Sequence, residues 1–335
     1  MVAGSDINRL LYKVAKAYYQ DNLTQEQIGD RFDLSRVKVS RLLQQARDAG
    51  IVHIIIVPPA VSNADVEREL EGRFGLDEAV VVTPPDHSKP AVVRMVGQAA
   101  ADYLGRHLHG HEVLGLSWGN TLAAVVQALA PQRWRSMKVV QILGGLGRPE
   151  AETYGADLTH RLAQTLGGRA RLVPAPGVVA SQVVRDALLA DPQISDTLSL
   201  AAHADVLLVG IGSPADPASV VRQTHILTDE EFTELGARGA VGDIALRFFD
   251  AAGRSVEHDI ENRMIGLDLN QIRHVPRVVG VAGGPDKLEA IHGALCGRLI
   301  DVLVTDDHSA AWLLANVASP QRLDVEKNKI AALTS

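Results

Sequence analysis

The chain has 335 residues, of which 46% are apolar and 22% are charged, ordinary values for a globular protein with a sizeable core. No stretch approaches the roughly 20 uncharged apolar residues of a membrane helix, which excludes a membrane-spanning protein. The N-terminus lacks the basic and apolar regions of an export signal, and a single cysteine, Cys296, can form no internal disulfide. We therefore expect a cytoplasmic protein of one or two domains.

The net charge of −7 is unevenly distributed along the chain. Residues 1–57 carry a net charge of +2, which leaves −9 for the remaining residues. Within this N-terminal segment, residues 35–47 contain four basic side chains and no acidic one. A local basic helix on an acidic body is typical of a surface that binds nucleic acid.

Three helices are predicted in the N-terminal segment. Apolar residues at helical spacing predict the first over residues 8–19. Thr24 and Gln27 form a capping box at the start of the second helix. Ser35 is a suitable N-cap for a third helix, which Gly50 would end. Two helices joined by a short turn are typical of a helix-turn-helix motif.

The third helix has an apolar stripe and a polar surface. The N-terminal part of a recognition helix meets base edges, where Arg can pair with guanine while Lys and hydroxyl groups suit phosphates. The alternative is a solvated charged face on a helical hairpin. The predicted buried stripe is Val39, Leu42, Leu43 and Ala46, and the predicted DNA-binding residues are Ser35, Arg36, Lys38, Ser40 and Arg41.

The sequence predicts four segments. Residues 1–57 form the DNA-binding domain. Its last part, Ile51–Val57, is predicted to be a strand that forms a wing or sheet edge at the end of this domain. Residues 58–63 begin with two prolines and form a linker. Residues 64–320 form the effector-binding and oligomerisation domain, and residues 321–335 form a C-terminal tail.

From residue 64 onward, apolar strand-like runs alternate with helical stretches, which predicts a mainly parallel sheet covered on both faces. In such a sheet the ligand site lies at the carboxyl ends of the strands. The predicted strands cover residues 79–82, 112–116, 138–143, 171–174, 206–210, 278–282 and 299–305. The predicted helices include residues 92–108, 121–129, 156–166 and 287–296.

Glycines and polar side chains gather at several corners of this segment. Residues 115–122 can hold an anion through backbone N–H groups and hydroxyls at a helix start. Residues 143–147 form a second glycine corner, and in a third Lys287 follows a glycine turn. Asp243 can accept hydroxyl protons from a polyol. Since strand-to-helix corners also need glycine and hydroxyl caps for structural reasons, each corner alone is a weak signal.

Two enzyme motifs are matched only in part. Gly115-x-Ser117-x-Gly119 matches the nucleophile elbow of α/β-hydrolases, but that fold needs several strands before its nucleophile and residues 64–111 offer about one. Gly210-x-Gly212 follows a strand as in a dinucleotide fingerprint, yet the prolines after it spoil the helix that should receive a pyrophosphate. We predict neither a hydrolase nor a nucleotide cofactor.

Histidines suggest a metal site only weakly. His107-x-His109-x-His111 resembles a metal-binding motif, but it lies between a helix end and a strand start, and no Cys or carboxylate pattern supports it. Asp306-Asp307-His308 is better interpreted as a helix cap with acids at the positive end of the helix dipole. No metal and no cofactor are predicted.

The order of these motifs is more specific than any one of them. Their order and spacing resemble those of the SorC family of bacterial sugar-responsive transcriptional regulators, over roughly residues 8–316. The residues that carry the resemblance are 34–43 and 46–52 in the helix-turn-helix, then 115–122, Gly144-Gly145, Gly210-Ile211-Gly212, Val241-Gly242-Asp243 and Ala282-Gly283-Gly284 with Lys287.

The resemblance implies a C-terminal sugar-binding domain with the fold of glucosamine-phosphate deaminases, ribose-phosphate isomerases and CoA transferases. It implies a sugar, polyol or sugar-phosphate effector and a homodimer or homotetramer. One departure from the family is Gly29, at a helix position where such motifs usually carry Ala. The effector-binding residues that it implies are Ser117, Gly119, Asn120, Thr121, Gly144, Gly145, Asp243, Gly283, Gly284 and Lys287.

We therefore expect a DNA-binding transcriptional regulator of a carbohydrate or polyol operon, not an enzyme. Operator DNA and effector would prefer different arrangements of the oligomer, so each changes the affinity for the other. Two alternatives remain open: a sugar-phosphate isomerase or deaminase on the same fold, and a ligand-binding protein whose helix-turn-helix mediates protein contacts. The basic third helix argues against the enzyme.

Overall fold

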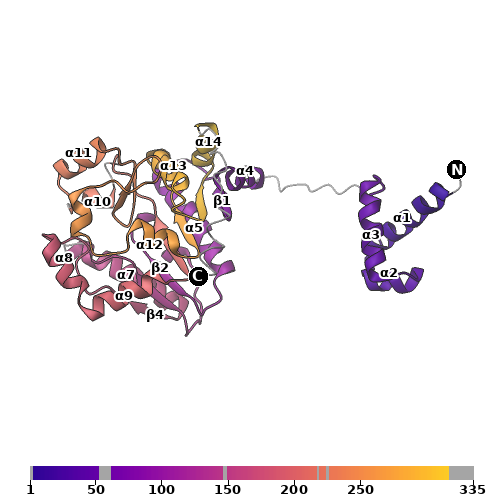
Figure 1. Cartoon of the computed structure of the whole chain (residues 1–335), viewed down its shortest axis with the longest axis horizontal. Helices are drawn as coiled ribbons and strands as arrows, with labels where there is room; N and C mark the ends of the chain where they lie inside the picture. Colours follow the sequence, from indigo (N-terminus) through magenta and orange to yellow (C-terminus); the bar gives the residue numbers. More distant parts are fainter. Residues whose placement is uncertain (1–2, 53–61, 146–148, 217–218, 224–225, 317–335) are drawn as a thin grey trace, which may run out of the picture. The chain divides into compact units, whose positions relative to one another are not determined.

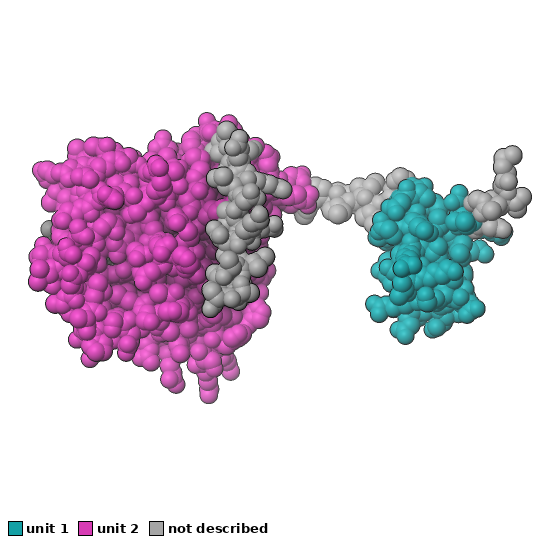
Figure 2. Space-filling model, viewed as in Figure 1, with its two compact units in different colours: residues 1–62 teal, residues 63–335 magenta. Residues whose placement is uncertain are grey.

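The computed structural model describes residues 3–52, 62–145, 149–216, 219–223 and 226–316. The chain forms two compact units, Met1–Ser62 and Asn63–Ser335, which we call unit 1 and unit 2 (Figure 2). Most of the predicted strand Ile51–Val57, most of the predicted linker 58–63 and the whole predicted tail 321–335 lie outside the described residues. Within the described part of the chain, no helix is long and apolar enough to span a bilayer.

The described residues of unit 1 form three helices around a small apolar core, as the sequence predicts. They are α1 (Ala3–Tyr19), α2 (Gln25–Phe32) and α3 (Arg36–Asp48), the first of which begins earlier than expected. The capping box is confirmed: the Thr24 N–H donates to Gln27 Oε1 at 2.9 Å, and the Gln27 N–H donates to Thr24 Oγ1 at 3.3 Å. The core contains Leu11, Val14, Ala15, Ala17, Ile28, Val39, Leu42, Leu43 and Ala46.

The turn between α2 and α3 explains the glycine at position 29. Asp33 ends α2 in the left-handed conformation with φ of 55°, and the Leu34 N–H donates to the Gly29 carbonyl at 2.8 Å. A Cβ on Gly29 would lie 2.6 Å from the carbonyl oxygen of Leu34. The close approach of the turn leaves no room for alanine at this position.

Unit 2, in which Figure 1 labels β1, β2 and β4, is built on a seven-stranded sheet in the order β1-β9-β8-β5-β2-β3-β4. Every neighbouring pair of strands in it is parallel, which confirms the predicted α/β architecture. The strands are β1 (Glu78–Val82), β2 (Val113–Leu116), β3 (Lys138–Gln141), β4 (Arg169–Arg171), β5 (Val206–Gly210), β8 (Val278–Val281) and β9 (Val302–Asp306).

Helices pack on both faces of this sheet. On one face lie α5 (Lys89–His107), α6 (Asn120–Ala128) and α7 (Pro149–Leu166). The helical segments that contribute buried residues to the other face are α4 (Ala64–Phe74), α9 (Pro192–Ala202), α10 (Val220–Gln223), α11 (Asp229–Ala237), η1 (Asp259–Arg263), α12 (Leu269–His274), α13 (Leu288–Cys296) and α14 (Asp307–Asn316). The remaining helical segments are α8 (Gln182–Leu189) and η2 (Pro285–Lys287).

The strand β5 shows how the two faces are filled. Val206 and Leu208 are buried in the core beneath α5, α6 and α7, whereas Leu207 and Val209 are buried in the core on the opposite face. Since successive side chains of a strand point to opposite faces, an unbroken apolar run is what a strand covered on both sides requires.

Some element boundaries differ from the prediction. The fourth strand covers Arg169–Arg171 rather than 171–174. Its pairing with β3 begins where the Arg169 N–H donates to the Met137 carbonyl at 2.9 Å, and at Val173 the N–H donates to the Gln141 side chain instead, at 3.2 Å. A two-stranded antiparallel hairpin of β6 (Gly242–Ile244) and β7 (Arg247–Phe249) was not predicted. Each of its strands has three residues, too few to show an alternating pattern.

Gly97 sets the distance between α5 and α6. A Cβ at this position would lie 2.6 Å from the Ala124 Cβ and 3.1 Å from the Val125 nitrogen. We expect Gly97→Ala to lower the free energy of unfolding by about 1–3 kcal/mol, because overpacking forces the two helices apart. Urea unfolding followed by tryptophan fluorescence measures this in unit 2, where all three tryptophans lie.

Gly105, on the same helix, provides the matched control. A Cβ there meets nothing within 4 Å, so Gly105→Ala should raise the free energy of unfolding by about 0.5 kcal/mol through helix propensity alone. Destabilisation of the same size by both changes would contradict the explanation by close helix packing.

Candidate functional site

A cavity of about 430 Å³ opens at the carboxyl ends of β2, β5 and β8, in the middle of the sheet. This is the edge at which parallel α/β sheets bind ligands, and pockets for small molecules measure about 300–1,000 Å³. We call it the pocket. The described residues that line it are Lys89, Pro90, Val93, Trp118, Gly119, Asn120, Thr121, Leu122, Gly210, Ile211, Gly212, Asp216, Ser219, Val221, Asp243, Ala245, Ala282, Gly283 and Lys287.

The connection from β2 to α6 brings the start of a helix to the pocket. Gly119 precedes α6 with φ of 130°, a conformation that favours glycine, and a Cβ there would have no neighbour within 4 Å. Gly119, Asn120 and Thr121 all line the pocket, at the helix end where an anion is favoured. Ser117 is buried instead, and its Oγ accepts a hydrogen bond from the Gly210 N–H at 3.3 Å, which ties β2 to β5.

Asp243 reaches the pocket from the β6–β7 hairpin. Its backbone pairs with Gly212: the Gly212 N–H donates to the Asp243 carbonyl at 2.8 Å, and the Asp243 N–H donates back at 3.1 Å. A Cβ on Gly212 would lie 1.9 Å from Asp243 Oδ1. Only glycine at position 212 lets the carboxyl group occupy this part of the pocket.

Backbone strain accompanies this carboxyl group. The two residues of the hairpin turn, Ala245 and Leu246, have φ of 53° and 66°, where a side chain costs about 1–2 kcal/mol each. The turn directs the Leu246 N–H to Asp243 Oδ2 at 3.2 Å. Strain of this kind persists where the surrounding structure holds a functional group in place.

Burial raises the pKa of the Asp243 carboxyl above its ordinary 3.8, while the positive charge of Lys287 and the hydrogen bond from Leu246 act in the opposite direction. Only one protein hydrogen bond to this carboxyl group is identified among the described residues. A ligand hydroxyl that donated to Asp243 would offset part of the cost of its burial.

Two lysines flank a second buried carboxylate of the pocket. Lys89 Nζ lies 2.8 and 3.0 Å from the two carboxylate oxygens of Asp216, and Lys287 Nζ lies 3.6 Å from Asp216 Oδ2. The side chain of Asp216 is 3% exposed, whereas those of Lys89 and Lys287 are 49% and 17% exposed. An anionic ligand would therefore compete with Asp216 for both ammonium groups.

Three of the predicted effector-binding glycines lie outside the pocket lining given above. The Gly144 N–H donates to the Ile265 carbonyl at 2.9 Å, and the Gly145 N–H donates to the Ala175 carbonyl at 2.8 Å. The Gly284 N–H donates to Asp306 Oδ2 at 2.7 Å. Their backbones connect neighbouring loops, whereas Gly283 lines the pocket itself.

Sequence reasoning missed four polar residues of the pocket: Lys89, Trp118, Asp216 and Ser219. Among the described residues, the buried Trp118 Nε1 finds no hydrogen-bond partner. Lys89 lies at the start of α5 and Asp216 just beyond β5. Their positions after β1 and β5 are the signal that could have found them.

His87, Asp307 and His308 could offer a metal ion one ligand atom each, with these atoms within 4.8 Å of one another. The two imidazole rings, however, stack with centroids 3.3 Å apart and planes 13° apart. Since a ring nitrogen binds a metal in the plane of its ring, two stacked rings cannot share one ion as they stand. The predicted helix cap is confirmed at Asp306, whose Oδ1 accepts from the Ser309 N–H at 3.1 Å.

The histidines of the weak metal motif have other contacts. His107 stacks on Tyr103 with centroids 4.1 Å apart and contacts the Tyr103 carbonyl through Nδ1 at 2.9 Å. His109 and His111 meet edge to face with centroids 6.3 Å apart. Each of the three side chains therefore contacts another residue of the chain.

In unit 1, α3 separates a buried stripe from an exposed face. The predicted stripe of Val39, Leu42, Leu43 and Ala46 is confirmed, since all four are buried. Ser35 is confirmed as the N-cap, with its Oγ accepting from the Lys38 N–H at 3.3 Å. The predicted DNA-binding residues Ser35, Arg36, Lys38, Ser40 and Arg41 are all exposed.

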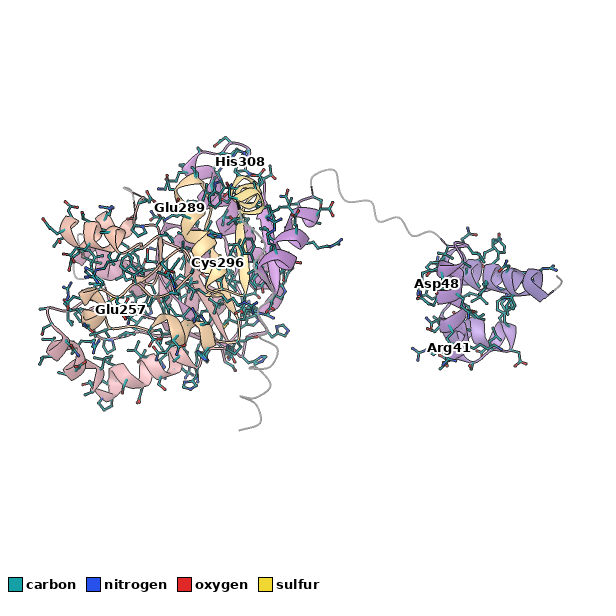
Figure 3. All side chains as sticks on the ribbon, turned by 45° about the horizontal axis from the view of Figure 1, so that its top comes forward. Arg41, Asp48, Glu257, Glu289, Cys296 and His308 are labelled. Carbon is teal, nitrogen blue, oxygen red and sulfur yellow. The ribbon has the colours of Figure 1, made fainter. Side chains whose placement is uncertain are left out.

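At about 100° per residue, the side of α3 opposite the buried stripe is occupied by Val37, Arg41, Gln44 and Asp48. Gln44 is already engaged, because its Nε2 donates to Asp48 Oδ1 at 2.8 Å and its Oε1 accepts from Arg47 at 2.6 Å. Arg41, labelled with Asp48 in Figure 3, has no hydrogen bond or ion pair with any described residue. Its guanidinium group is thus available to a partner.

Comparison with known proteins finds a family model and relatives that match most of the chain. Residues 59–315 match the family model Sugar-bind, described as "Putative sugar-binding domain". The sorbitol operon regulator of Klebsiella pneumoniae is 34% identical over 315 residues, which are 92% of this chain and 99% of that protein. The deoxyribonucleoside regulator of Bacillus subtilis is 32% identical over 306 residues, 91% of this chain and 97% of that protein.

Among solved structures, the full-length sorbitol operon regulator SorC from Klebsiella pneumoniae matches with a TM-score of 0.71 and 33% identity, covering 92% of this chain and 99% of that one. The class that these features define is that of transcriptional regulators with an N-terminal helix-turn-helix and a C-terminal sugar-binding domain. The chain belongs to the SorC family of such regulators.

The raised pKa of Asp243 has a consequence for stability. Since its folded-state pKa lies above the unfolded value, ionised Asp243 destabilises the fold above the folded-state pKa, and this cost vanishes below the unfolded value. We expect Asp243→Asn to be more stable than the unchanged protein at pH 7–8, with a gain that shrinks toward pH 4. Urea unfolding at several pH values measures this difference.

Asp196→Asn, on the exposed side of α9, removes the same charge without relieving burial. At every pH of the series, its free energy of unfolding should be close to that of the unchanged protein. A loss of stability in Asp243→Asn that persists at pH 7–8 would contradict the cost assigned to the buried carboxylate.

Proposed function

We propose that this regulator binds operator DNA through α3 of unit 1 and a phosphorylated sugar or polyol through the pocket of unit 2. The pairing of Lys89 and Lys287 with buried Asp216, beside the start of α6, carries the effector half of the proposal. The relatives described above are named as a sorbitol operon regulator and a deoxyribonucleoside regulator, which supports an effector of carbohydrate type.

The pocket offers different chemistry to different parts of such a ligand. A phosphate group binds at the start of α6 and replaces Asp216 as the partner of the two lysines, because a charge-assisted hydrogen bond to a dianion is strong. Asp243 accepts from ligand hydroxyls. The apolar residues of the wall, such as Val93 and Ile211, cover the carbon skeleton.

Regulation follows from linkage between the two units. If DNA and effector favour different arrangements of the protein, each lowers or raises the affinity for the other by the same factor. We propose that the chain works as a homodimer or homotetramer, because one small helix-turn-helix makes few contacts and dimers read two half-sites about 34–36 Å apart or multiples of that.

We also propose that the pocket binds its ligand without converting it. The relatives are named as regulators, which supports this, although the fold class is expected to be shared with sugar-phosphate isomerases and deaminases. Incubation of the protein with ribose 5-phosphate and fructose 6-phosphate, followed by NMR, should return both compounds unchanged. Protein-dependent turnover would favour the enzyme.

Lys287→Ala and Lys89→Ala should weaken binding of the phosphorylated effector by about 10-fold or more, because each removes a hydrogen bond to a charged group. Binding of the matching unphosphorylated sugar should change much less. Calorimetry with ribose 5-phosphate, fructose 6-phosphate and the two free sugars first identifies a ligand and then compares the variants.

Lys138→Ala is the control for this pair, since Lys138 is exposed at the amino end of β3, away from the pocket edge of the sheet. It should bind the ligand as tightly as the unchanged protein. Equal weakening of phosphorylated and free sugars by Lys287→Ala would show that the lysine does not hold a phosphate.

Arg41→Ala should weaken operator binding by about 1–3 kcal/mol and relax the preference at one base pair, as expected for loss of a bidentate contact to guanine. Arg36→Ala, at the side of the same helix, should weaken binding and lower its salt dependence. Fluorescence anisotropy on a duplex selected from a random library by the full chain measures both effects.

Lys13→Ala removes one positive charge from an exposed position of α1 and controls for net charge. It should have a smaller effect than Arg41→Ala and should leave base preference intact. If neither arginine change alters affinity for the selected duplex, α3 is not the surface that binds DNA.

A further inference from the structure

Val37 is the most exposed large apolar side chain of the described residues of unit 1. It is 63% exposed, whereas the next two, Ile7 and Tyr12, are 56% exposed. It lies in the first turn of α3 between the charged side chains of Arg36 and Lys38. The core of unit 1 gives no reason for a valine here, because the buried stripe lies on the opposite side of the helix.

Helix propensity gives no reason for this valine either. A β-branched side chain loses rotamer freedom in a helix, so most unbranched residues would favour the helix more at an exposed position. The valine thus has a cost in local stability and places an apolar group in water. A partner that covers the side chain removes the apolar group from water and thereby offsets this cost.

Val37 and Arg41 are four residues apart and form neighbours on the outward side of α3. Gln44, one turn further along that side, is engaged with Asp48 and Arg47. The part of the outward side that remains available is therefore one apolar side chain next to one guanidinium group. The N-terminal part of a recognition helix is also the part that lies closest to base edges.

We infer that Val37 reads the 5-methyl group of a thymine beside the guanine that Arg41 contacts. The thymine methyl is the apolar group that base pairs present in the major groove, so it is the surface there that a valine can match. This inference rests on the proposed DNA binding and adds a base preference to it: each half-site contains a thymine within one or two base pairs of the Arg41 guanine.

Replacing thymine by deoxyuridine tests this directly, because it removes the methyl group and preserves base pairing. In a duplex selected from a random library by the full chain, one thymine per half-site should be sensitive, with a loss of about 4-fold on substitution, as expected for one buried methyl group. Substitution at the other thymines should have little effect.

The variant Val37→Ala links that thymine to this side chain. Alanine favours a helix more than valine, so the variant should fold, and its binding should no longer distinguish thymine from deoxyuridine at the sensitive position. Val37→Thr, which keeps one methyl group at the same distance, should retain part of the discrimination.

Three results would overturn the inference, and they have different meanings. If no duplex is enriched, the proposed DNA binding fails and the base preference fails with it. If a duplex is enriched but no deoxyuridine substitution matters, only the role of Val37 is wrong. If Val37→Ala weakens binding equally to the thymine duplex and to the deoxyuridine duplex, and light scattering shows a changed oligomeric state, Val37 contacts protein rather than DNA.

Discussion

The common direction of the seven strands is the constraint on which the pocket depends. Because every neighbouring pair is parallel, the chain turns at the same edge of the sheet after each strand. Residues as distant in sequence as Lys89 and Lys287 therefore meet around one carboxylate. Because β2, β5 and β8 are central in the sheet, residues that follow all three strands form the walls of the pocket. The helices packed on both faces of the sheet hold these strands in place.

Close backbone approach completes this arrangement. Gly212 allows the β6–β7 hairpin to pair with the chain just after β5. The strained turn of the hairpin places the Leu246 N–H where it donates a hydrogen bond to Asp243. The hairpin adds a carboxyl group to a cavity that already contains Asp216 and two lysines. A pocket with compensating charges can remain folded without ligand and still discriminate ligands by charge, since an anion must displace an existing partner.

The sequence predicted the parts of the fold that follow from local patterns. The three helices of unit 1, the capping box at Thr24 and the parallel order of apolar strands were all recognisable from spacing and caps. Local patterns did not reveal the β6–β7 hairpin, whose strands are too short to show alternation. The family resemblance, rather than a local pattern, places Gly144 and Gly145 among the effector-binding residues, and the structure shows their N–H groups bonded to the carbonyls of Ile265 and Ala175.

The site was recognisable in part for the same reason. Gly119, Asn120 and Thr121 belong to one continuous corner, which a sequence motif can show. Asp216 and Lys89 come from separate connections, and their pairing depends on which strands are neighbours in the sheet, a property that the order of residues does not contain. The buried stripe of α3 could be read from helical spacing, but the exposure of Val37 became informative only once the opposite side of the helix was known to be packed.

We propose that one sugar phosphate and one DNA duplex bind the same chain and change the affinity for each other. The most direct measurement is the dissociation constant of the selected duplex with and without a saturating sugar phosphate, together with the reciprocal measurement on the sugar phosphate. Both dissociation constants should change by the same factor, and neither should change with the unphosphorylated sugar. A ligand that binds the pocket and leaves the affinity for DNA unchanged would contradict it.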